Sequence, residues 1–206
     1  MQSELPSAYR KVEYLQSDGG QYIIADTKIF EDTVCKCKFV LTAPRTNQQT
    51  YASIFGIVIG ASSNPGFVVF TSAQYICGRF GYWSATGTGT INTDALVEEN
   101  IEYNVVCALN SITLAGQTYT GSQRWNTSLE NRKMGIFCRA REDDTALNRS
   151  VTKGRIYKLS FKSASAGGNA NFIPCVRKSD SKPGMYDTVS KTFYTNAGTG
   201  EFIVPA

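Results

Sequence analysis

Apolar and polar residues alternate along this chain with a period of two, which is the repeat of a β-strand and not of an α-helix. Residues 34–41 read VCKCKFVL, so that the two lysines fall on one face while the two cysteines, Phe39 and Leu41 fall on the other. Residues 101–109, IEYNVVCAL, repeat the pattern. The alternation predicts a chain of strands that each bury one face.

Three continuous apolar runs complete this pattern: SIFGIVIG at 53–60, GFVVF at 66–70 and MGIFC at 134–138. Such runs suit central strands that are covered on at least one side throughout. With the turns rich in Gly, Ser, Asn and Pro, the sequence predicts about twelve to fourteen short strands. The segment TDALVEEN, residues 93–100, is the one expected helical turn, with Asp94 as its cap.

Length and composition agree with a single all-β domain that spans residues 1–206. Charged residues make up 18% and hydrophobic ones 42%, which excludes a disordered chain or a coiled coil. The chain has no run of 18 apolar residues, and its first residues have no apolar signal region. We therefore expect no membrane insertion and no signal peptide.

Cysteine and histidine counts narrow the chemistry further. There are six cysteines and no histidine, so neither a Ser-His-Asp nor a Cys-His nucleophile can be assembled. The cysteines lack the paired spacing of a zinc site, and several fall in the apolar phase of strands. We expect six unbridged thiols that act as small buried hydrophobes, with no metal and no cofactor.

Two segments resemble a known family. Residues 5–23 read LPSAYRKVEYLQSDGGQYI, and residues 154–202 begin GRIYKLSFK and end with KPGMYDTVSKTFYTNAGTGEF. Their order and spacing resemble a group of concanavalin A/laminin-G-like jelly-roll proteins of gut bacteriophages and prophages. Residues 30–140 match that group only in pattern. The resemblance implies a jelly-roll sandwich of two antiparallel sheets.

Enzymatic activity is the first functional class to consider, because the same fold includes glycoside hydrolases. Such enzymes need two carboxylates that face each other across the sugar. The laminarinase-type Glu-x-Asp-x-x-Glu pattern is absent, and the acidic clusters Glu98–Glu99 and Glu142–Asp144 place consecutive acids on opposite faces of a strand. The sequence therefore predicts no catalytic residues.

The acidic loop 142–144 could hold calcium, but it lacks alternating Asp-x-Asp ligands, and a solvated loop is the alternative.

Carbohydrate binding is the second class, because sugars bind to aromatic platforms with planar polar side chains beside them. Two segments have this composition, and each tryptophan could instead be a core residue. The candidate ligand-binding residues are Arg79, Tyr82, Trp83, Arg124, Trp125 and Asn126.

The resemblance implies a virion-associated protein: a tail, fibre or head appendage subunit that is assembled in the host cytoplasm. Its partners would be other virion proteins and a host-surface glycan, with no nucleic acid, and we expect a homo-oligomer such as a trimer. A purely structural decoration subunit and a bacterial surface lectin are the alternatives.

Residues 139–178 hold nine basic residues against three acidic ones, a local net charge of +6. This excess could attract anionic glycans or phosphates, or could be a solvated sheet face.

Overall fold

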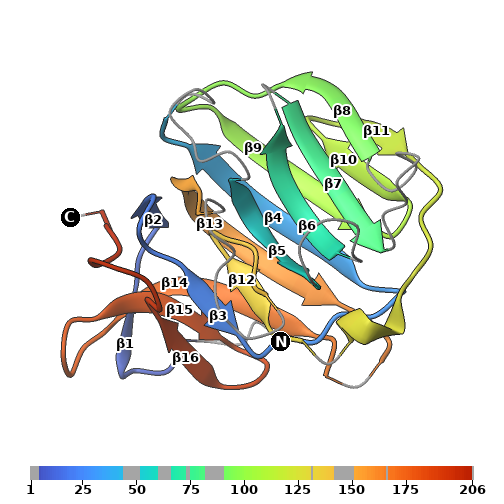
Figure 1. The fold of residues 1–206 in the computed structure, drawn as a ribbon. Helices are drawn as coiled ribbons and strands as arrows, with labels where there is room; N and C mark the ends of the chain where they lie inside the picture. The colour runs from blue at the N-terminus through green and yellow to red at the C-terminus, as the bar shows by residue number, and fades with distance from the viewer. Residues whose placement is uncertain are drawn as a thin grey trace.

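The protein is an all-β sandwich of two antiparallel sheets (Figure 1). The computed structural model describes residues 5–43, 52–59, 66–72, 75–81, 91–130, 132–141, 151–165 and 167–205. Within these ranges the chain forms sixteen strands and one short 3-10 helix. The fold class predicted from the sequence is confirmed. The strands outnumber the predicted twelve to fourteen, and several of them are only three or four residues long.

The larger sheet contains ten strands and carries both ends of the chain. Its main path, from one edge to the other, is β11 (Gln117–Thr120), β10 (Ser111–Leu114), β9 (Glu102–Ala108), β4 (Val34–Leu41), β13 (Lys153–Lys162), β14 (Ala170–Arg177), β15 (Pro183–Asp187) and β16 (Thr192–Thr195). Two further strands, β1 (Tyr9–Lys11) and β2 (Leu15–Asp18), pair with β14 and β13.

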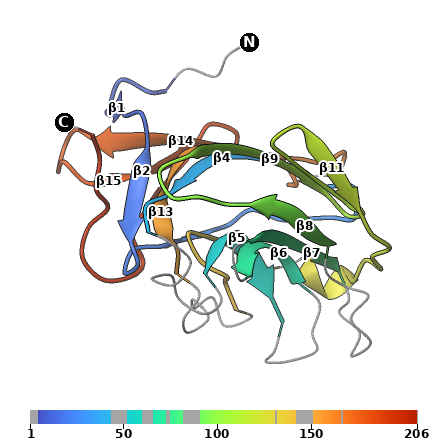
Figure 2. The ribbon, with the colours of Figure 1, turned by 90° about the horizontal axis from the view of Figure 1, so that it is seen from above.

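The smaller sheet contains six strands and covers one face of the larger sheet (Figure 2). Its order is β3 (Ile23–Ala25), β12 (Met134–Ile136), β5 (Ser53–Val58), β6 (Gly66–Ser72), β7 (Tyr75–Gly81) and β8 (Ile91–Leu96). The apolar runs predicted to be central strands form β5, β6 and β12, and every residue of β5 is buried.

The two N-terminal strands fill a fork between β13 and β14. These neighbours pair with each other only at residues 159–161 and 170–172. Further along, β2 takes the place of β14 beside residues 153–156, and β1 takes the place of β13 beside residues 175–177. Strands β1 and β2 therefore complete hydrogen bonds that β13 and β14 do not make with each other. Residues 5–23 and 154–202 are therefore neighbours in this sheet.

The core lies between the sheets and is built from the apolar phase of each strand. On β4, Cys35, Cys37, Phe39 and Leu41 are buried, as the alternation predicts, and Val40 of the other phase is buried as well. Phenylalanines fill the centre; Phe55 contacts Phe161 edge to face with ring centroids 5.7 Å apart. Burial of each large side chain contributes about 1.5–3 kcal/mol.

The structure describes the side chains of five of the six cysteines, and all five are free, buried thiols, as the sequence predicts. Cys35 and Cys107 lie opposite each other on β4 and β9, and Cys138 and Cys175 are buried elsewhere. Burial raises the pKa of Cys175 to about 12 and raises the pKa of Cys35 well above its ordinary value. These thiols stay protonated, so they act as small apolar side chains. The side chain of Cys77, on β7, lies outside the described residues.

One local prediction is wrong. Residues 93–96, expected in a helical turn capped by Asp94, belong to strand β8, which pairs with β7. Pairing with a neighbouring strand overrides the weak local helix signal. The 3-10 helix lies instead at η2 (Thr127–Leu129). Among the described residues there is no helix with the length and apolarity to cross a bilayer.

Candidate functional site

The first predicted glycan-binding segment lies largely outside the described residues. Arg79 is on β7, in register with Val68 of β6, and its side chain is not described. Tyr82 and Trp83 follow β7 and fall outside the described ranges. The same holds for the acidic loop 142–144, the predicted calcium candidate. These predictions stay predictions.

The second predicted segment is a turn between β11 and β12 in which a tryptophan has a structural role. Trp125 is half-buried and packs against the core. Its indole N–H donates a 2.8 Å hydrogen bond to Oε1 of Glu130. A tryptophan that uses both its ring face and its N–H inside the protein has less surface for a sugar.

Within this turn, the side chain of Asn126 has a structural role, whereas Arg124 is exposed. The side chain of Asn126 caps η2, because its Oδ1 accepts a 3.0 Å hydrogen bond from the backbone N–H of Ser128. Arg124 is exposed. The structure thus brings the three predicted residues together on one turn, where Arg124 presents the most accessible polar group.

Gln123, next to this turn, is a polar residue that the sequence analysis missed. Its side chain is 8% exposed, and neither its Oε1 nor its Nε2 has a hydrogen-bond partner. Its backbone N–H donates to Oδ1 of Asn110 at 2.7 Å, which fixes the turn. A buried amide without partners is costly, so this position is energetically unusual. The sequence carries no signal for it, because glutamine in a turn is ordinarily solvated.

A different site forms where the two ends of the chain meet. The turn before β3 and the loop after β16 are joined by two backbone hydrogen bonds, from the N–H of Ala197 to Tyr22 and from the N–H of Thr199 to Gly20. A Cβ on Gly198 would lie 2.1 Å from the carbonyl oxygen of Gly20. Only glycine permits this close approach, which accounts for the glycine at position 198.

The side chain of Asn196 organises this junction. Its Oδ1 accepts hydrogen bonds from the backbone N–H of Tyr22 at 3.0 Å and from that of Gly198 at 2.8 Å. Its Nδ2 donates to the carbonyl of Gly200 at 2.8 Å. Both polar atoms of the amide are therefore used inside the protein, and Asn196 shapes the loop.

A polar pocket of about 150 Å³ opens beside this junction. Its lining residues include Lys182, Thr195 and Glu201, whose side chains carry an ammonium, a hydroxyl and a carboxylate, and the buried residues Pro183 and Phe202. The remaining lining residues are Asn196, Gly198 and Gly200. The pocket therefore combines a donor, an acceptor and a hydroxyl with a small apolar part.

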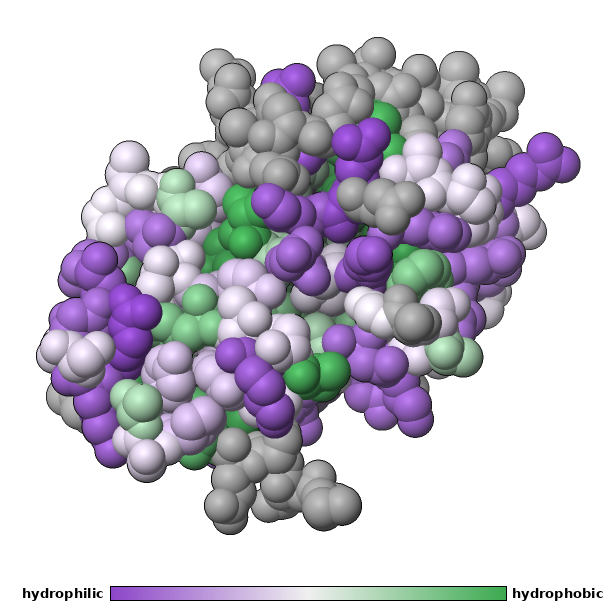
Figure 3. Space-filling model, turned by 90° about the horizontal axis from the view of Figure 1, so that it is seen from below, coloured by the Kyte–Doolittle hydropathy of each residue, from purple (hydrophilic) through white to green (hydrophobic). Residues whose placement is uncertain are grey.

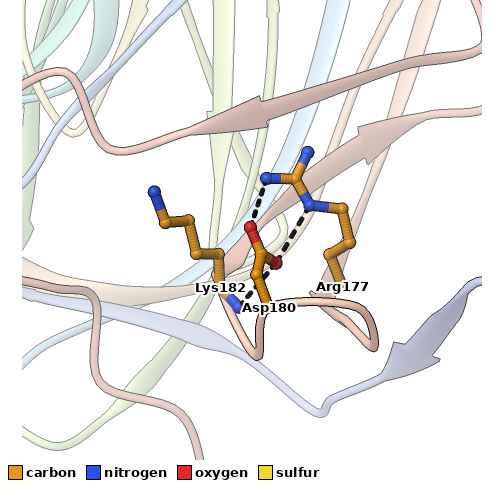
Figure 4. Close-up of polar contacts among 3 residues, drawn as sticks. All are labelled: Arg177, Asp180 and Lys182. Carbon is orange, nitrogen blue, oxygen red and sulfur yellow. Dashed lines mark hydrogen bonds and ion pairs between the residues drawn. The ribbon is translucent and has the colours of Figure 1, made fainter.

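An ion pair in the turn between β14 and β15 lies next to Lys182 (Figure 4). Arg177 donates to Asp180 through Nε at 3.0 Å and Nη2 at 2.6 Å. The backbone N–H of Lys182 donates to the same carboxylate at 3.2 Å, while its ammonium points away from it (Figure 4). The hydrogen bond from Arg177 is the main cause that lowers the pKa of Asp180 to about 2.

Aromatic rings brace Arg177 from the neighbouring strands. Its guanidinium lies 5.0 Å from the centroid of the Phe193 ring, and Phe193 contacts Tyr9 at 5.0 Å. Tyr9 in turn contacts Tyr186 at 4.9 Å. Strands β1, β15 and β16 thus contribute a cluster of rings against which the side chain of Arg177 lies.

The face shown in Figure 3 is mainly hydrophilic, with apolar residues in small separate areas. The exposed large hydrophobic residues of the described chain are Ile101, Val189 and Ile203. They belong to different segments, so they form no continuous stretch of sequence.

Comparison with known proteins identifies a similar architecture at low identity. No protein-family model matches the chain, and no curated protein sequence matches it. Among solved structures, it is similar to the native heptameric SAP-like pentraxin from Limulus polyphemus, with a TM-score of 0.49 and 8% sequence identity. The similarity covers 73% of each chain.

Proposed function

We propose that this protein is a non-enzymatic, carbohydrate-binding component of a bacteriophage particle. The observation that carries the binding proposal is the polar pocket of Lys182, Thr195 and Glu201. An ammonium and a hydroxyl can donate to sugar oxygens, and a carboxylate can accept from sugar hydroxyls. The apolar atoms of Pro183 and Phe202 suit the C–H face of a ring. This combination of polar and apolar groups is typical of small-molecule sites.

The size of the pocket limits the ligand. Its volume of about 150 Å³ lies below the roughly 300–1,000 Å³ of sites that enclose a drug-sized molecule. We infer that it takes one sugar unit of a longer chain. One weak contact of this kind gains from repetition, and linked copies can raise apparent affinity by about 10²–10⁴. A homo-oligomer such as a trimer would supply the copies.

The absence of enzymatic activity is part of the proposal. Glycoside hydrolysis requires two facing carboxyl groups, about 5–10 Å apart. Among the residues that line the pocket, Glu201 is the one carboxylate. Glu201 is also exposed to solvent. These features favour binding over hydrolysis.

The virion assignment rests on the resemblance of residues 5–23 and 154–202 to phage jelly-roll proteins. Both segments contribute to the junction beside the pocket, where Gly20 and Tyr22 bond to the loop 196–200. The resemblance therefore extends to the part of the protein that shapes the candidate site. A purely structural decoration subunit remains the alternative, and ligand binding decides between them.

Binding is tested by saturation-transfer NMR with galactose, glucose, mannose, N-acetylglucosamine and glucuronic acid as separate probes. We expect transfer to at least one of these sugars, with amide shift changes confined to residues near Pro183 and Thr195. Thr195→Val and Glu201→Gln each remove a hydrogen-bonding group, and each is expected to weaken binding about tenfold or more.

Matched controls are Thr120→Val on β11 and Glu13→Gln before β2, which change the same chemical groups at exposed positions away from the pocket. Binding that is equally sensitive to both sets, or no transfer to any sugar, would overturn the binding proposal. Mass spectrometry of purified particles tests the virion role independently, and absence of the chain from the particles would overturn it.

A further inference from the structure

The outer face of the large sheet carries a strip of cations that the pocket does not use. On β4, Lys36 and Lys38 alternate with the buried cysteines 35 and 37, so both lysines point away from the core. On β13, Lys158 and Lys162 flank the buried Phe161 and Leu159 in the same way. No other described strand lies over this face in Figure 2.

A β-bulge adds an aromatic ring to this strip. The register between β13 and β4 shifts between Ile156 and Lys158, so Tyr157 is the extra residue. Ile156 and Leu159 are buried on either side, whereas Tyr157 is half-buried and Lys158 exposed. The bulge thus turns two successive side chains outward, and bulges commonly re-aim side chains near functional sites.

Two tyrosines order the cations beside them. The rings of Tyr14 and Tyr157 meet edge to face with centroids 5.4 Å apart. The guanidinium of Arg155 lies 4.8 Å from the centroid of Tyr14, and Nζ of Lys38 lies 5.3 Å from that of Tyr157. Arg155 also donates through Nε to Gln16 at 2.7 Å. Two of the cations are therefore fixed in place before any ligand binds.

The strip consists of Lys36, Lys38, Arg155, Lys158 and Lys162, and its charge is poorly neutralised. Lys38 lies directly opposite Lys158 across β4 and β13, an arrangement that is destabilising for like charges. Within the described residues, Lys38 forms the strip's one ion pair, at 2.8 Å from Glu102. Five cations against that carboxylate leave a net charge of +4. Fixed, closely spaced cations of this kind attract a polyanion.

We propose that this basic strip binds an acidic polysaccharide, a linear glycan with repeated carboxylate or sulfate groups. Strand geometry spaces neighbouring cations about 5–7 Å apart over one face of the sheet, which suits an extended polymer with closely repeated acids. Single-stranded nucleic acid is disfavoured, because its bases need free aromatic faces for stacking. Here both tyrosine rings already contact each other and the cations. The proposal extends the proposed glycan binding to a second surface.

Dextran sulfate is the test ligand, with unsulfated dextran and a single-stranded oligothymidylate as comparisons, measured by biolayer interferometry at 50 and 200 mM salt. We expect dextran sulfate to bind, dextran not to bind, and the affinity to fall at least about tenfold between the two salt concentrations. Oligothymidylate is expected to bind at least about tenfold more weakly than dextran sulfate.

The variant Lys36→Gln/Lys158→Gln/Lys162→Gln is expected to lose about tenfold or more of this affinity. The matched control Arg10→Gln/Lys28→Gln/Lys178→Gln removes the same charge from exposed residues outside the strip, and we expect a loss below about threefold. Equal losses in both variants, equal binding of dextran, or equally tight oligothymidylate binding would each overturn the proposal. Thr195→Val is expected to leave dextran sulfate binding unchanged, which separates this surface from the pocket.

Discussion

Oδ1 of Asn196 accepts a 3.0 Å hydrogen bond from the backbone N–H of Tyr22, a residue 174 positions earlier in the chain. This one contact joins the N-terminal turn to the C-terminal loop. Backbone hydrogen bonds from Ala197 and Thr199 follow on the same side of the junction. The amide of Asn196 therefore sets the position of the loop that lines the polar pocket.

Asn196→Ala is expected to destabilise the protein, because it removes three side-chain hydrogen bonds and leaves the N–H of Tyr22 without its partner. At about 0.5–1.5 kcal/mol for each bond, the free energy of unfolding should fall by roughly 2–3 kcal/mol. Urea unfolding measures the change. Asn104→Ala, at an exposed position on β9, is the control and should change stability by less than about 0.5 kcal/mol. Equal effects of the two changes would contradict the role of Asn196.

In the turn 124–126, substitutions can test the structural role of Trp125 separately from a binding role of Arg124. Trp125→Ala removes a half-buried ring and its hydrogen bond to Glu130, and should lower the free energy of unfolding by roughly 2 kcal/mol or more. Arg124→Ala changes an exposed residue and should leave stability within about 0.5 kcal/mol. If this turn binds glycan, Arg124→Ala weakens sugar binding at unchanged stability, which NMR titration with thermal unfolding detects. Unchanged binding would leave the turn with a structural role alone.

Gln123→Met is expected to stabilise the protein. The amide of Gln123 is buried and lacks hydrogen-bond partners, whereas methionine has a similar length and no strongly polar group. Removal of an unsatisfied buried amide should raise the free energy of unfolding by about 1–3 kcal/mol. Chemical denaturation gives the sign directly. A loss of stability would show that the amide makes contacts in solution that the structure lacks.

Most of the fold is predictable from the sequence because a period of two identifies a strand and its buried face together. Residues 34–41 show this, since all four side chains of their apolar phase are buried, whereas residues 53–58 form a continuous apolar run that is buried throughout. The pattern fails for residues 93–96, where local helix signals compete with pairing to β7. It also cannot reveal the fork between β13 and β14, because strand order depends on contacts between distant segments.

The candidate sites were less predictable than the fold. Composition identified Trp125 as an aromatic near polar residues, but its hydrogen bond to Glu130 depends on a turn that composition does not define. The pocket joins Lys182, Thr195 and Glu201, which lie in three separate turns or strands. The basic strip had a partial signal, the excess of charge in residues 139–178. Its partners on β4 became visible only through the register between Lys38 and Lys158.

The pair between Arg177 and Asp180 predicts a dependence of stability on acid. Its hydrogen bonds lower the pKa of Asp180 from 3.8 to about 2 in the folded protein. A lowered carboxyl pKa gives a stabilisation that is complete above the unfolded value and is lost as the pH falls through the folded value. The contribution should therefore decrease between about pH 4 and pH 2. NMR titration of the Asp180 carboxyl tests the pKa, and Arg177→Gln should return it toward the ordinary value. A titration midpoint near 4 in the unaltered protein would contradict the pairing.

The C-terminal strands should be required for folding. Removal of residues 171–206 deletes most of β14 and all of β15 and β16, and it leaves β1 without its partner. It also removes Phe202, which is 4% exposed and contacts Phe137 at 5.4 Å between ring centroids. We expect insoluble or unfolded protein by circular dichroism, because a domain of this size has only about 5–15 kcal/mol of total stability. Phe202→Ala alone should cost about 3–5 kcal/mol, whereas Val189→Ala, at an exposed position, should cost less than about 0.5 kcal/mol. A truncated chain that melts cooperatively near the full-length temperature would show that the remaining strands form a sufficient core without the fork.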